Sequence, residues 1–234
     1  MTRPVPAPLS TETHDQAHDQ APVVVALTGA TASIIGFMTL KALMELDQNV
    51  LCIISSKSFQ VIAEEMGVAP PTHPQGQAEA VLKIIDIDPD SHAARRLTCL
   101  SSKDTGAPPA SGTFLTKGMV IAPCSMTTLG KLASGIADNL VCRAADVTLK
   151  ERRPLVLVPR ESPLNRIHLQ NMLTVHDAGA RLVPPVLSFY KPAFNTVDGQ
   201  LMHTVGKVLD QLGFTQHQLS PRWSGMRAAD PLPV

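Results

Sequence analysis

Short apolar segments alternate with longer segments of helical periodicity along most of the chain. Continuous apolar runs predict five strands, at residues 22–28, 49–56, 118–125, 153–162 and 180–186. Apolar residues spaced by three and four predict helices at 33–46, 57–66, 126–135, 138–149, 163–178 and 195–212. We expect Pro163 in the first turn of its helix. Residues 68–78 are expected to be loop, and residues 78–100 mix a short helix or strand with charged loop.

This alternation predicts an α/β protein with a Rossmann-like, three-layer α/β/α fold and a mainly parallel sheet. The strands are apolar nearly throughout, which is typical of parallel strands covered on both faces. The first two strands flank a helix, so we expect a right-handed βαβ crossover. Ligands of such sheets bind beyond the carboxyl ends of the strands, here residues 28–33, 55–58, 123–128 and 159–162.

Composition narrows the class of protein. The 234 residues, 44% of them hydrophobic, suit one domain, which we expect at residues 21–213. Residues 1–20 are expected to be a disordered polar tail, and residues 214–234 a C-terminal tail that packs over the site. Lysine plus arginine equals aspartate plus glutamate, 20 each, and no basic run suggests nucleic-acid binding.

Cysteine usage and hydropathy predict the compartment. The four cysteines form no CxxC pair, and the polar N-terminal segment does not resemble a secretory signal. No apolar run reaches the ~18 residues that a membrane span needs. These features predict a cytoplasmic protein with reduced thiols and no membrane partner.

The segment "TGATAS" at residues 28–33 lies between the first strand and its helix. Gly29 permits a tight turn, Thr31 and Ser33 supply hydroxyls, and a helix N-terminus favours a phosphate. The segment is neither a GxGxxG nor a Walker A motif, and an ordinary capped turn explains it equally well.

A second turn of this kind follows the strand at 118–125. Ser125, Thr127 and Thr128 lie where a strand becomes a helix, so they are candidates to hold a ligand. Helix capping is the commoner role for Ser125. For Cys124, a buried structural role is favoured over a nucleophilic one.

Residues 143–163 are rich in charge within a mostly apolar chain. Arg143 and Lys150 are seven residues apart and therefore share one helix face. Arg160 and Glu161 close a strand, and a carboxylate beside cations is a candidate general acid or base. A surface ion-pair network remains an equal alternative.

Metal-binding patterns are absent from the sequence. "DIDPDSH" at residues 86–92 begins like a calcium loop, but Ser91 and Leu97 stand where glycine and glutamate are needed. The sequence contains no DDxxD cluster and no structural-zinc spacing. We therefore expect no metal site.

Four segments resemble the flavin prenyltransferases, the UbiX/Pad family of flavoprotein fold. They are "TGATAS", "IISSKS", "GARLVPPVLSFYKP" and the long block "MVIAPCSMTTLGKLASGIADNLVCRAADVTLKERRPLVLVPRESPLNRIHLQNM", and the resemblance covers roughly residues 22–223. Related cysteine decarboxylases typically carry PASANT and PxMNxxM. The strings "PPASGTF" and "SPLNRIHLQNM" fit the prenyltransferases better.

The resemblance implies a metal-independent transferase. The enzyme would join the dimethylallyl group of dimethylallyl monophosphate to N5 of reduced FMN and then close a ring onto C6. The product, prenylated FMN, would serve a partner decarboxylase. A homododecamer is usual for the family.

The resemblance also implies roles for individual residues. Catalytic roles fall on Glu161, Lys150 and Glu65. Contacts to FMN fall on Gly29, Ala30, Thr31, Ser55, Ser125, Met126, Thr127, Thr128 and Arg143. Contacts to the prenyl donor fall on Lys150, Arg160, Tyr190, Lys207 and Trp223.

Three positions depart from the family pattern. Its usual Gly-Ala-Ser-Gly reads Gly-Ala-Thr-Ala here, with Thr31 and Ala32. The usual arginine at position 207 is Lys207, which makes a point contact with phosphate instead of a bidentate one. A tryptophan of some members is Thr105. These changes bear on the affinity for the donor and on its chain length.

Two other functions are compatible with these motifs. One is an FMN-dependent decarboxylase of a cysteine-type substrate, which would need a suitable base. His168 lies within a predicted helix and is expected to be structural. The other is a non-catalytic flavin-binding subunit of a decarboxylase, which would not need Glu161, Lys150, Arg160 and Tyr190.

Overall fold

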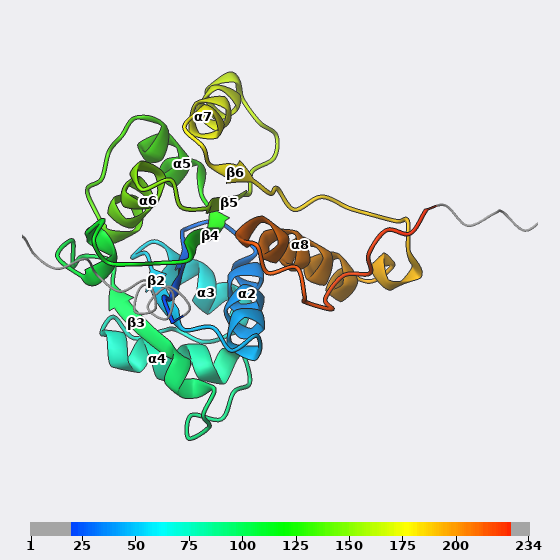
Figure 1. Ribbon diagram of the computed structural model, residues 1–234, viewed down its shortest axis with the longest axis horizontal. Coiled ribbons are helices and arrows are strands. Elements are labelled where there is room, and N and C mark those ends of the chain that lie inside the picture. The colour runs from blue at the N-terminus through cyan, green and yellow to red at the C-terminus, as the bar shows by residue number, and fades with distance from the viewer. Residues whose placement is uncertain (1–19, 226–234) are drawn as a thin grey trace, which may run out of the picture.

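The structure, a computed structural model, describes residues 20–225 and contains a six-stranded parallel sheet (Figure 1). Its strand order is β3-β2-β1-β4-β5-β6. The strands are β1 (Val23–Leu27), β2 (Val50–Ile54), β3 (Leu97–Ser101), β4 (Gly118–Cys124), β5 (Leu155–Pro159) and β6 (Arg181–Leu182). The expected tail at residues 1–20 lies, except for Gln20, outside the described residues.

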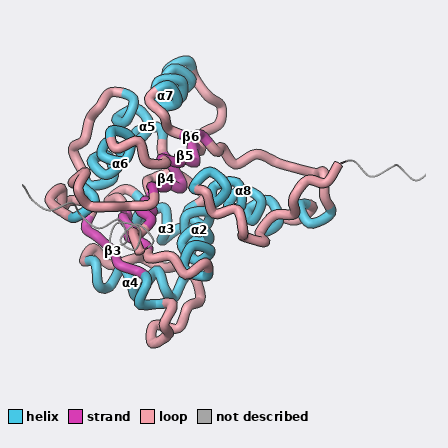
Figure 2. The backbone as a smooth tube through the Cα atoms, in the orientation of Figure 1, coloured by secondary structure: helices cyan, strands magenta, loops and turns pink. Residues whose placement is uncertain are grey.

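Helices cover both faces of the sheet, as Figure 2 shows. One face carries α2 (Ser33–Glu45), α3 (Ser58–Met66), α4 (Pro74–Ile84) and α8 (Val197–Leu212). The other carries α5 (Met126–Ala133), α6 (Leu140–Lys150) and α7 (Arg166–Asp177). The predicted three-layer α/β/α fold is confirmed.

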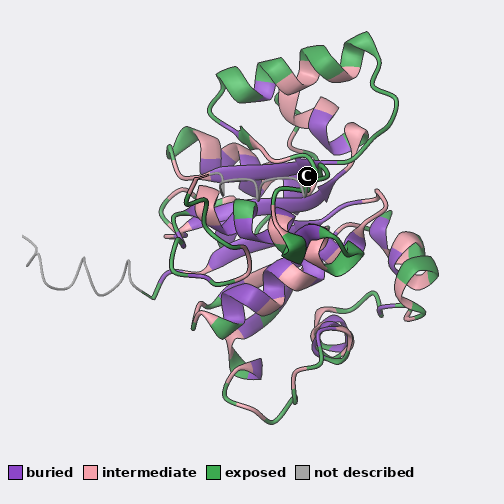
Figure 3. Ribbon diagram, turned by 90° about the vertical axis from the view of Figure 1, so that its right-hand side faces the viewer, coloured by how far each residue is buried: buried purple, intermediate pink, exposed green. Residues whose placement is uncertain are grey.

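Two hydrophobic cores, one on each face, explain why the strands are continuously apolar. In β1, Val23, Val25 and Leu27 point into the core under α2 and α8, whereas Val24 and Ala26 point into the core under α5 and α6. Successive side chains of a strand face opposite sides, so both sets must be apolar. Strand β1 is accordingly buried along its length, as are the other central strands β4 and β5 (Figure 3).

Helix α2 packs unusually close to the sheet at Gly36. A Cβ atom at this position would lie 2.2 Å from the carbonyl oxygen of Ala122 and 2.9 Å from Cγ of Leu27. Only glycine allows this approach, which brings the first turn of α2 near the end of β4.

The segment around residues 68–100 differs from the sequence-based expectation. Helix α4 begins at Pro74, inside the expected loop, because the ring of His73 caps it by accepting a hydrogen bond from the Gly76 amide at 3.1 Å. Strand β3 lies at the sheet edge, where Thr98 is exposed. An edge strand needs less continuous apolar sequence than a central one, so its pattern is weak.

Helix α7 and strand β6 are shorter than predicted. The expectation that Pro163 occupies the first turn of α7 is wrong, since the helix begins at Arg166 after Asn165. Asn165 and His168 form a reciprocal capping box, which confirms the structural role of His168. Only Arg181 and Leu182 of the expected strand at 180–186 pair with β5. Within residues 20–225, no helix is long and apolar enough to cross a membrane.

Candidate functional site

The turns after β1 and β4 are tied together by Thr28. Its hydroxyl donates to the carbonyl oxygen of Pro123 at 2.8 Å and accepts from the amide of Ser125 at 2.8 Å. Thr28 is buried, so these two bonds hold the two strand ends in one fixed arrangement.

The end of β2 is hydrogen-bonded to the end of β1. The Ser55 amide and the Ser58 hydroxyl both donate to the carbonyl oxygen of Leu27, at 2.9 and 2.8 Å. The hydroxyls of Ser55 and Ser58 lie 2.8 Å apart. Three predicted ligand-binding turns therefore meet at one edge of the sheet, as expected for the carboxyl ends of parallel strands.

A cavity of about 110 Å³ lies between these turns. It is lined by Gly29, Ser55, Ser56, Lys57, Ser125, Thr127, Thr128, Lys131 and Asn139. A Cβ atom at Gly29 would lie 2.8 Å from Cβ of Lys57, so glycine is needed for the turns to approach. Hydroxyls, two lysines and a helix N-terminus form a set of donors suited to a phosphate.

Four of the residues that line this cavity were not predicted as site residues: Ser56, Lys57, Lys131 and Asn139. Lys57 follows the serines of "IISSKS", where its position after a strand was the available signal. Lys131 lies in α5, and its Nζ is 2.6 Å from Oδ2 of Asp138. The hydrogen bond between them raises the pKa of Lys131 and lowers that of Asp138, so both are charged at neutral pH.

Ser125 caps a helix and lines the cavity, and its role in holding a ligand stays a prediction. Its hydroxyl caps α5 by accepting from the Thr128 amide at 3.2 Å, and it also lines the cavity. Met126 is the first residue of α5. The structural interpretation of Cys124 is confirmed: it is fully buried, and burial raises the pKa of its thiol.

Glu65, from α3, occupies the N-terminus of α2. Its carboxylate accepts hydrogen bonds from the hydroxyl of Thr31 and from the amides of Ala32 and Ser33, the latter two at 2.8 Å. Ala32 has a left-handed backbone with φ of 74°, which alanine rarely adopts. Partial burial raises the pKa of Glu65, but these hydrogen bonds outweigh it and hold the pKa below its usual value. The cavity described above lies apart from this contact, between Gly29, Lys57 and Ser125.

Helix α6 presents Arg143 and Lys150 to the same loop, as their spacing predicts. Nε of Arg143 donates to the carbonyl oxygen of Ala110 at 3.1 Å, and its guanidinium pairs with Asp146 at 2.8 Å. Lys150 pairs with Glu151, and its Nζ would lie 2.6 Å from a Cβ atom at Gly112. In this structure both cations form the ion pairs that were the alternative interpretation.

Arg153 is a structural residue that the sequence did not reveal. Its guanidinium donates to the carbonyl oxygens of Phe114 and Gly112, at 2.8 and 2.7 Å. These bonds fasten residues 112–114 to the end of α6, beside Lys150.

Arg160 and Glu161 follow β5 at the carboxyl edge of the sheet, and both side chains are exposed. The Arg160 amide donates to the carbonyl oxygen of Cys124 at 3.3 Å, which sets it beside the second turn. Oε1 of Glu161 accepts from the Ser162 amide at 3.1 Å.

Tyr190, Trp223 and Lys207 form a separate group. The rings of Tyr190 and Trp223 meet edge to face with centroids 5.7 Å apart, and Lys191 Nζ lies 5.2 Å from the Trp223 ring. With Lys207 they line a cavity of about 360 Å³. This end of the molecule projects on the side opposite α6 (Figure 1). A single chain therefore brings together some donor-binding candidates but leaves Lys150 apart from them.

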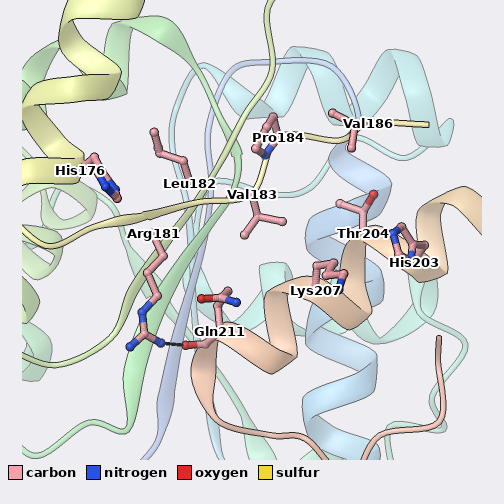
Figure 4. A pocket seen from close by; sticks show the side chains of 10 residues that line it. All are labelled: His176, Arg181, Leu182, Val183, Pro184, Val186, His203, Thr204, Lys207 and Gln211. Carbon is pink, nitrogen blue, oxygen red and sulfur yellow. Dashed lines mark hydrogen bonds between the residues drawn. The ribbon is translucent and has the colours of Figure 1, made fainter. Parts of the chain in front are cut away.

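A wider cavity, about 710 Å³, lies between α8 and the segment that follows α7 (Figure 4). Leu182, Val183, Pro184 and Val186 give it apolar walls, while Arg181 and Lys207 supply cations. Lys207 lines both large cavities. Within residues 20–225, no group of three or more His, Cys, Asp or Glu side chains is placed to hold a metal ion.

A doubly covered parallel sheet with a phosphate-sized cavity at its carboxyl edge defines a nucleotide-binding α/β protein. The family model described as Flavoprotein matches residues 11–212. Flavin prenyltransferase UbiX of Pseudomonas aeruginosa is 39% identical over 201 residues, which cover 86% of this chain and 93% of that protein.

Solved structures of UbiX-type proteins show the same similarity. The complex of AnUbiX (PadA1) with FMN and dimethylallyl pyrophosphate has a TM-score of 0.75 and 37% identity, covering 89% of this chain and all of that one. A dodecameric FMN-dependent UbiX-like decarboxylase from Escherichia coli O157:H7 has a TM-score of 0.73 and 39% identity, covering 87% of this chain and all of that one. The chain belongs to the Flavoprotein family and, within it, to the UbiX-type flavin prenyltransferases.

The alternative of a cysteine-type decarboxylase rests on more distant likeness. A PPC decarboxylase mutant superimposes with a TM-score of 0.53 at 16% identity, covering 82% of this chain and 99% of that one, which shows a common fold alone. The activity assigned to this chain is therefore prenyl transfer, and the enzyme is a transferase.

Proposed function

We propose that this enzyme transfers a dimethylallyl group from dimethylallyl monophosphate to reduced FMN, first at N5 and then at C6. The observation that carries the proposal is the cavity at the three tied strand ends, with its hydroxyls, Lys57 and Lys131. The similarity to AnUbiX, solved with FMN and dimethylallyl pyrophosphate, supports the same pair of ligands.

FMN fits the residues at the carboxyl edge. Its phosphate would be held by Gly29, Ser55, Lys57 and Thr128, which surround a cavity of suitable size. The further contacts proposed from the resemblance are Ala30, Thr31, Ser125, Met126, Thr127 and Arg143. When bound and reduced, FMN supplies the nucleophilic N5 and C6 atoms.

The prenyl donor needs cations at its leaving phosphate. Lys150, Arg160, Lys207 and the Tyr190 hydroxyl would bind this phosphate and stabilise the charge that develops as it leaves. These groups replace a metal ion, so we expect transfer to proceed in the presence of a chelator. Trp223 and apolar neighbours would exclude water from an allylic cation.

Glu161 is the proposed proton-transferring group. Its carboxylate is exposed at the strand end beside Arg160, so it is free to take up or deliver a proton during ring closure. Glu65 is proposed to act with Thr31, whose hydroxyl it already holds.

The complete site is proposed to form between copies in a homododecamer. Tyr190 and Trp223 are 71% and 55% exposed, and the segments before and after α8 that carry them project on the side opposite α6, the helix that ends at Lys150 (Figure 1). Exposed apolar side chains on α7 and in the segment after β6, including Ile167, Leu187 and Phe189, suit burial against another copy. The dodecameric E. coli relative supports this assembly.

The product is proposed to leave for a partner decarboxylase that acts on unsaturated or aromatic acids. We propose that the reaction takes place in the cytoplasm, where reduced flavin and free thiols persist. The partner would use prenylated FMN as its own cofactor.

An anaerobic assay tests the function directly. The protein is mixed with reduced FMN and either dimethylallyl monophosphate or pyrophosphate, with and without chelator, and the flavin is extracted for mass spectrometry. We expect a flavin heavier by one C5H8 unit with the monophosphate. Tightly bound but unmodified FMN with both donors would refute prenyl transfer by this chain.

A further inference from the structure

The chain after α8 turns back and runs along that helix as a strap, which we define as residues 213–223. Phe214 is buried, and its amide donates to the carbonyl oxygen of Leu209 at 3.0 Å. Further on, Nδ1 of His203 and Oγ of Ser220 lie 3.1 Å apart. The strap therefore passes successive turns of α8 in the reverse direction.

Gly206 allows the strap to lie flat on the helix. A Cβ atom there would lie 3.0 Å from both Cε1 of His217 and Cβ of Ser220. This is closer than side chains normally pack, so the surface of α8 is shaped to receive this segment.

Asp210, near the end of α8, binds the strap at two points. Its carboxylate oxygens accept hydrogen bonds from Nη1 of Arg222 at 2.7 and 2.8 Å. Oδ1 also lies 3.1 Å from Nε2 of His217, whose side chain is almost fully buried. Only 18% of the Asp210 side chain is exposed, so water competes little for these bonds.

The contact between Asp210 and Arg222 is next to the aromatic pair. Trp223 directly follows Arg222, and its ring packs edge to face on Tyr190. Asp210, Arg222, Trp223 and Tyr190 all line the cavity that contains Lys207. The position of Trp223 thus depends on the anchor one residue before it.

We propose that Asp210 is a positioning residue: through Arg222 and His217 it holds Trp223 against Tyr190 and thereby shapes the donor end of the site. The inference rests on the proposed function for the roles of Tyr190 and Trp223 in donor binding. Asp210 itself takes no part in the chemistry.

The chain's single tryptophan makes the test specific. Trp223 fluorescence anisotropy is measured in the assembled, full-length protein for the wild type, Asp210→Asn and Arg222→Gln. Asp198→Asn, which removes an exposed carboxylate from the first turn of the same helix, is the matched control. KM for dimethylallyl monophosphate, kcat, FMN affinity and Tm are measured on the same samples.

We expect both variants to lower the Trp223 anisotropy and to raise the donor KM about three- to tenfold, the effect of losing one charge-assisted pair. FMN affinity should not change, kcat should change less than KM, and Asp198→Asn should match the wild type. Asp210→Asn combined with Arg222→Gln should raise the donor KM by less than the product of the two single effects, because the two variants share one broken contact.

Two outcomes would overturn the proposal. Unchanged anisotropy in both variants would mean that Asp210 does not hold Trp223, and lower anisotropy with unchanged donor KM would mean that the strap does not shape the donor site. If Asp210→Asn fails to fold, Arg222→Gln carries the test, since the Arg222 side chain is 53% exposed. If the wild type transfers no prenyl group, the proposed function fails, whereas anisotropy still tests the anchor.

Discussion

Glu161 carries the most direct prediction at the residue scale. Its exposed carboxylate beside Arg160 can be replaced by an amide without disturbing the core. We expect Glu161→Gln to lose about 100-fold or more in kcat, the usual contribution of a positioned acid or base, and to retain FMN. Anaerobic turnover and flavin content of the purified variant measure the two effects. Unchanged turnover would remove Glu161 from the proposed role.

The thiols allow a second prediction at this scale. All four cysteines are buried; a hydrogen bond with Cys99 and burial raise the pKa of Cys52, and burial raises that of Cys124. Since the thiolate is the reactive form, a thiol reagent should label far less than one cysteine per native chain and all four after denaturation. Rapid labelling of Cys124 in the native protein would argue for a reactive role instead.

At the scale of elements, the carboxylate of Glu65 joins α3 to the start of α2. Its pKa is lowered from 4.5, so the folded state favours its charged form. The resulting stability is present above the unfolded-state pKa and is lost as the pH falls through the folded-state pKa.

We therefore expect Glu65→Gln to reduce the free energy of unfolding at neutral pH by about 1 kcal/mol, the usual value of a helix cap. The difference in unfolding free energy between variant and wild type should shrink as the pH falls through the folded-state pKa of Glu65. Urea denaturation across pH measures this, with the neighbouring exposed Glu64→Gln as control. A difference that persists undiminished in acid would mean that Glu65 stabilises the helix without its charge.

At the scale of the whole molecule, the separation of Tyr190 from Lys150 predicts complementation between subunits. Tyr190→Phe and Lys150→Met should each lose most activity as pure oligomers. Co-assembled at equal amounts, they should recover about a quarter of wild-type activity, because random mixing leaves that share of sites intact when two copies form each site.

A double variant distinguishes complementation between subunits from a recovery of activity caused by co-assembly alone. Lys150→Met co-assembled with a chain that carries both substitutions contains no intact Lys150, so it should recover nothing. No recovery in the first mixture would place both residues in the site of one chain and contradict the shared site.

The pattern of apolar residues by itself determined the architecture, because two-sided burial of a parallel sheet requires continuous apolar strands and one apolar face on each helix. It also determined that the turns at Gly29, Ser55 and Ser125 meet, since parallel strands end at the same edge. Helix α4 and strand β3 escaped prediction because a histidine cap and an exposed edge leave little periodicity.

Only the tertiary structure decided which side chains share these turns and which lie apart. Thr28 ties two strand ends, Glu65 fills the helix start that the sequence equally allowed for an external anion, and Lys57 lines the cavity. These contacts join residues distant in sequence, and no local pattern encodes them. The strap on α8 is of the same kind: Asp210 and Arg222 meet where the chain returns along the helix and packs closely on Gly206.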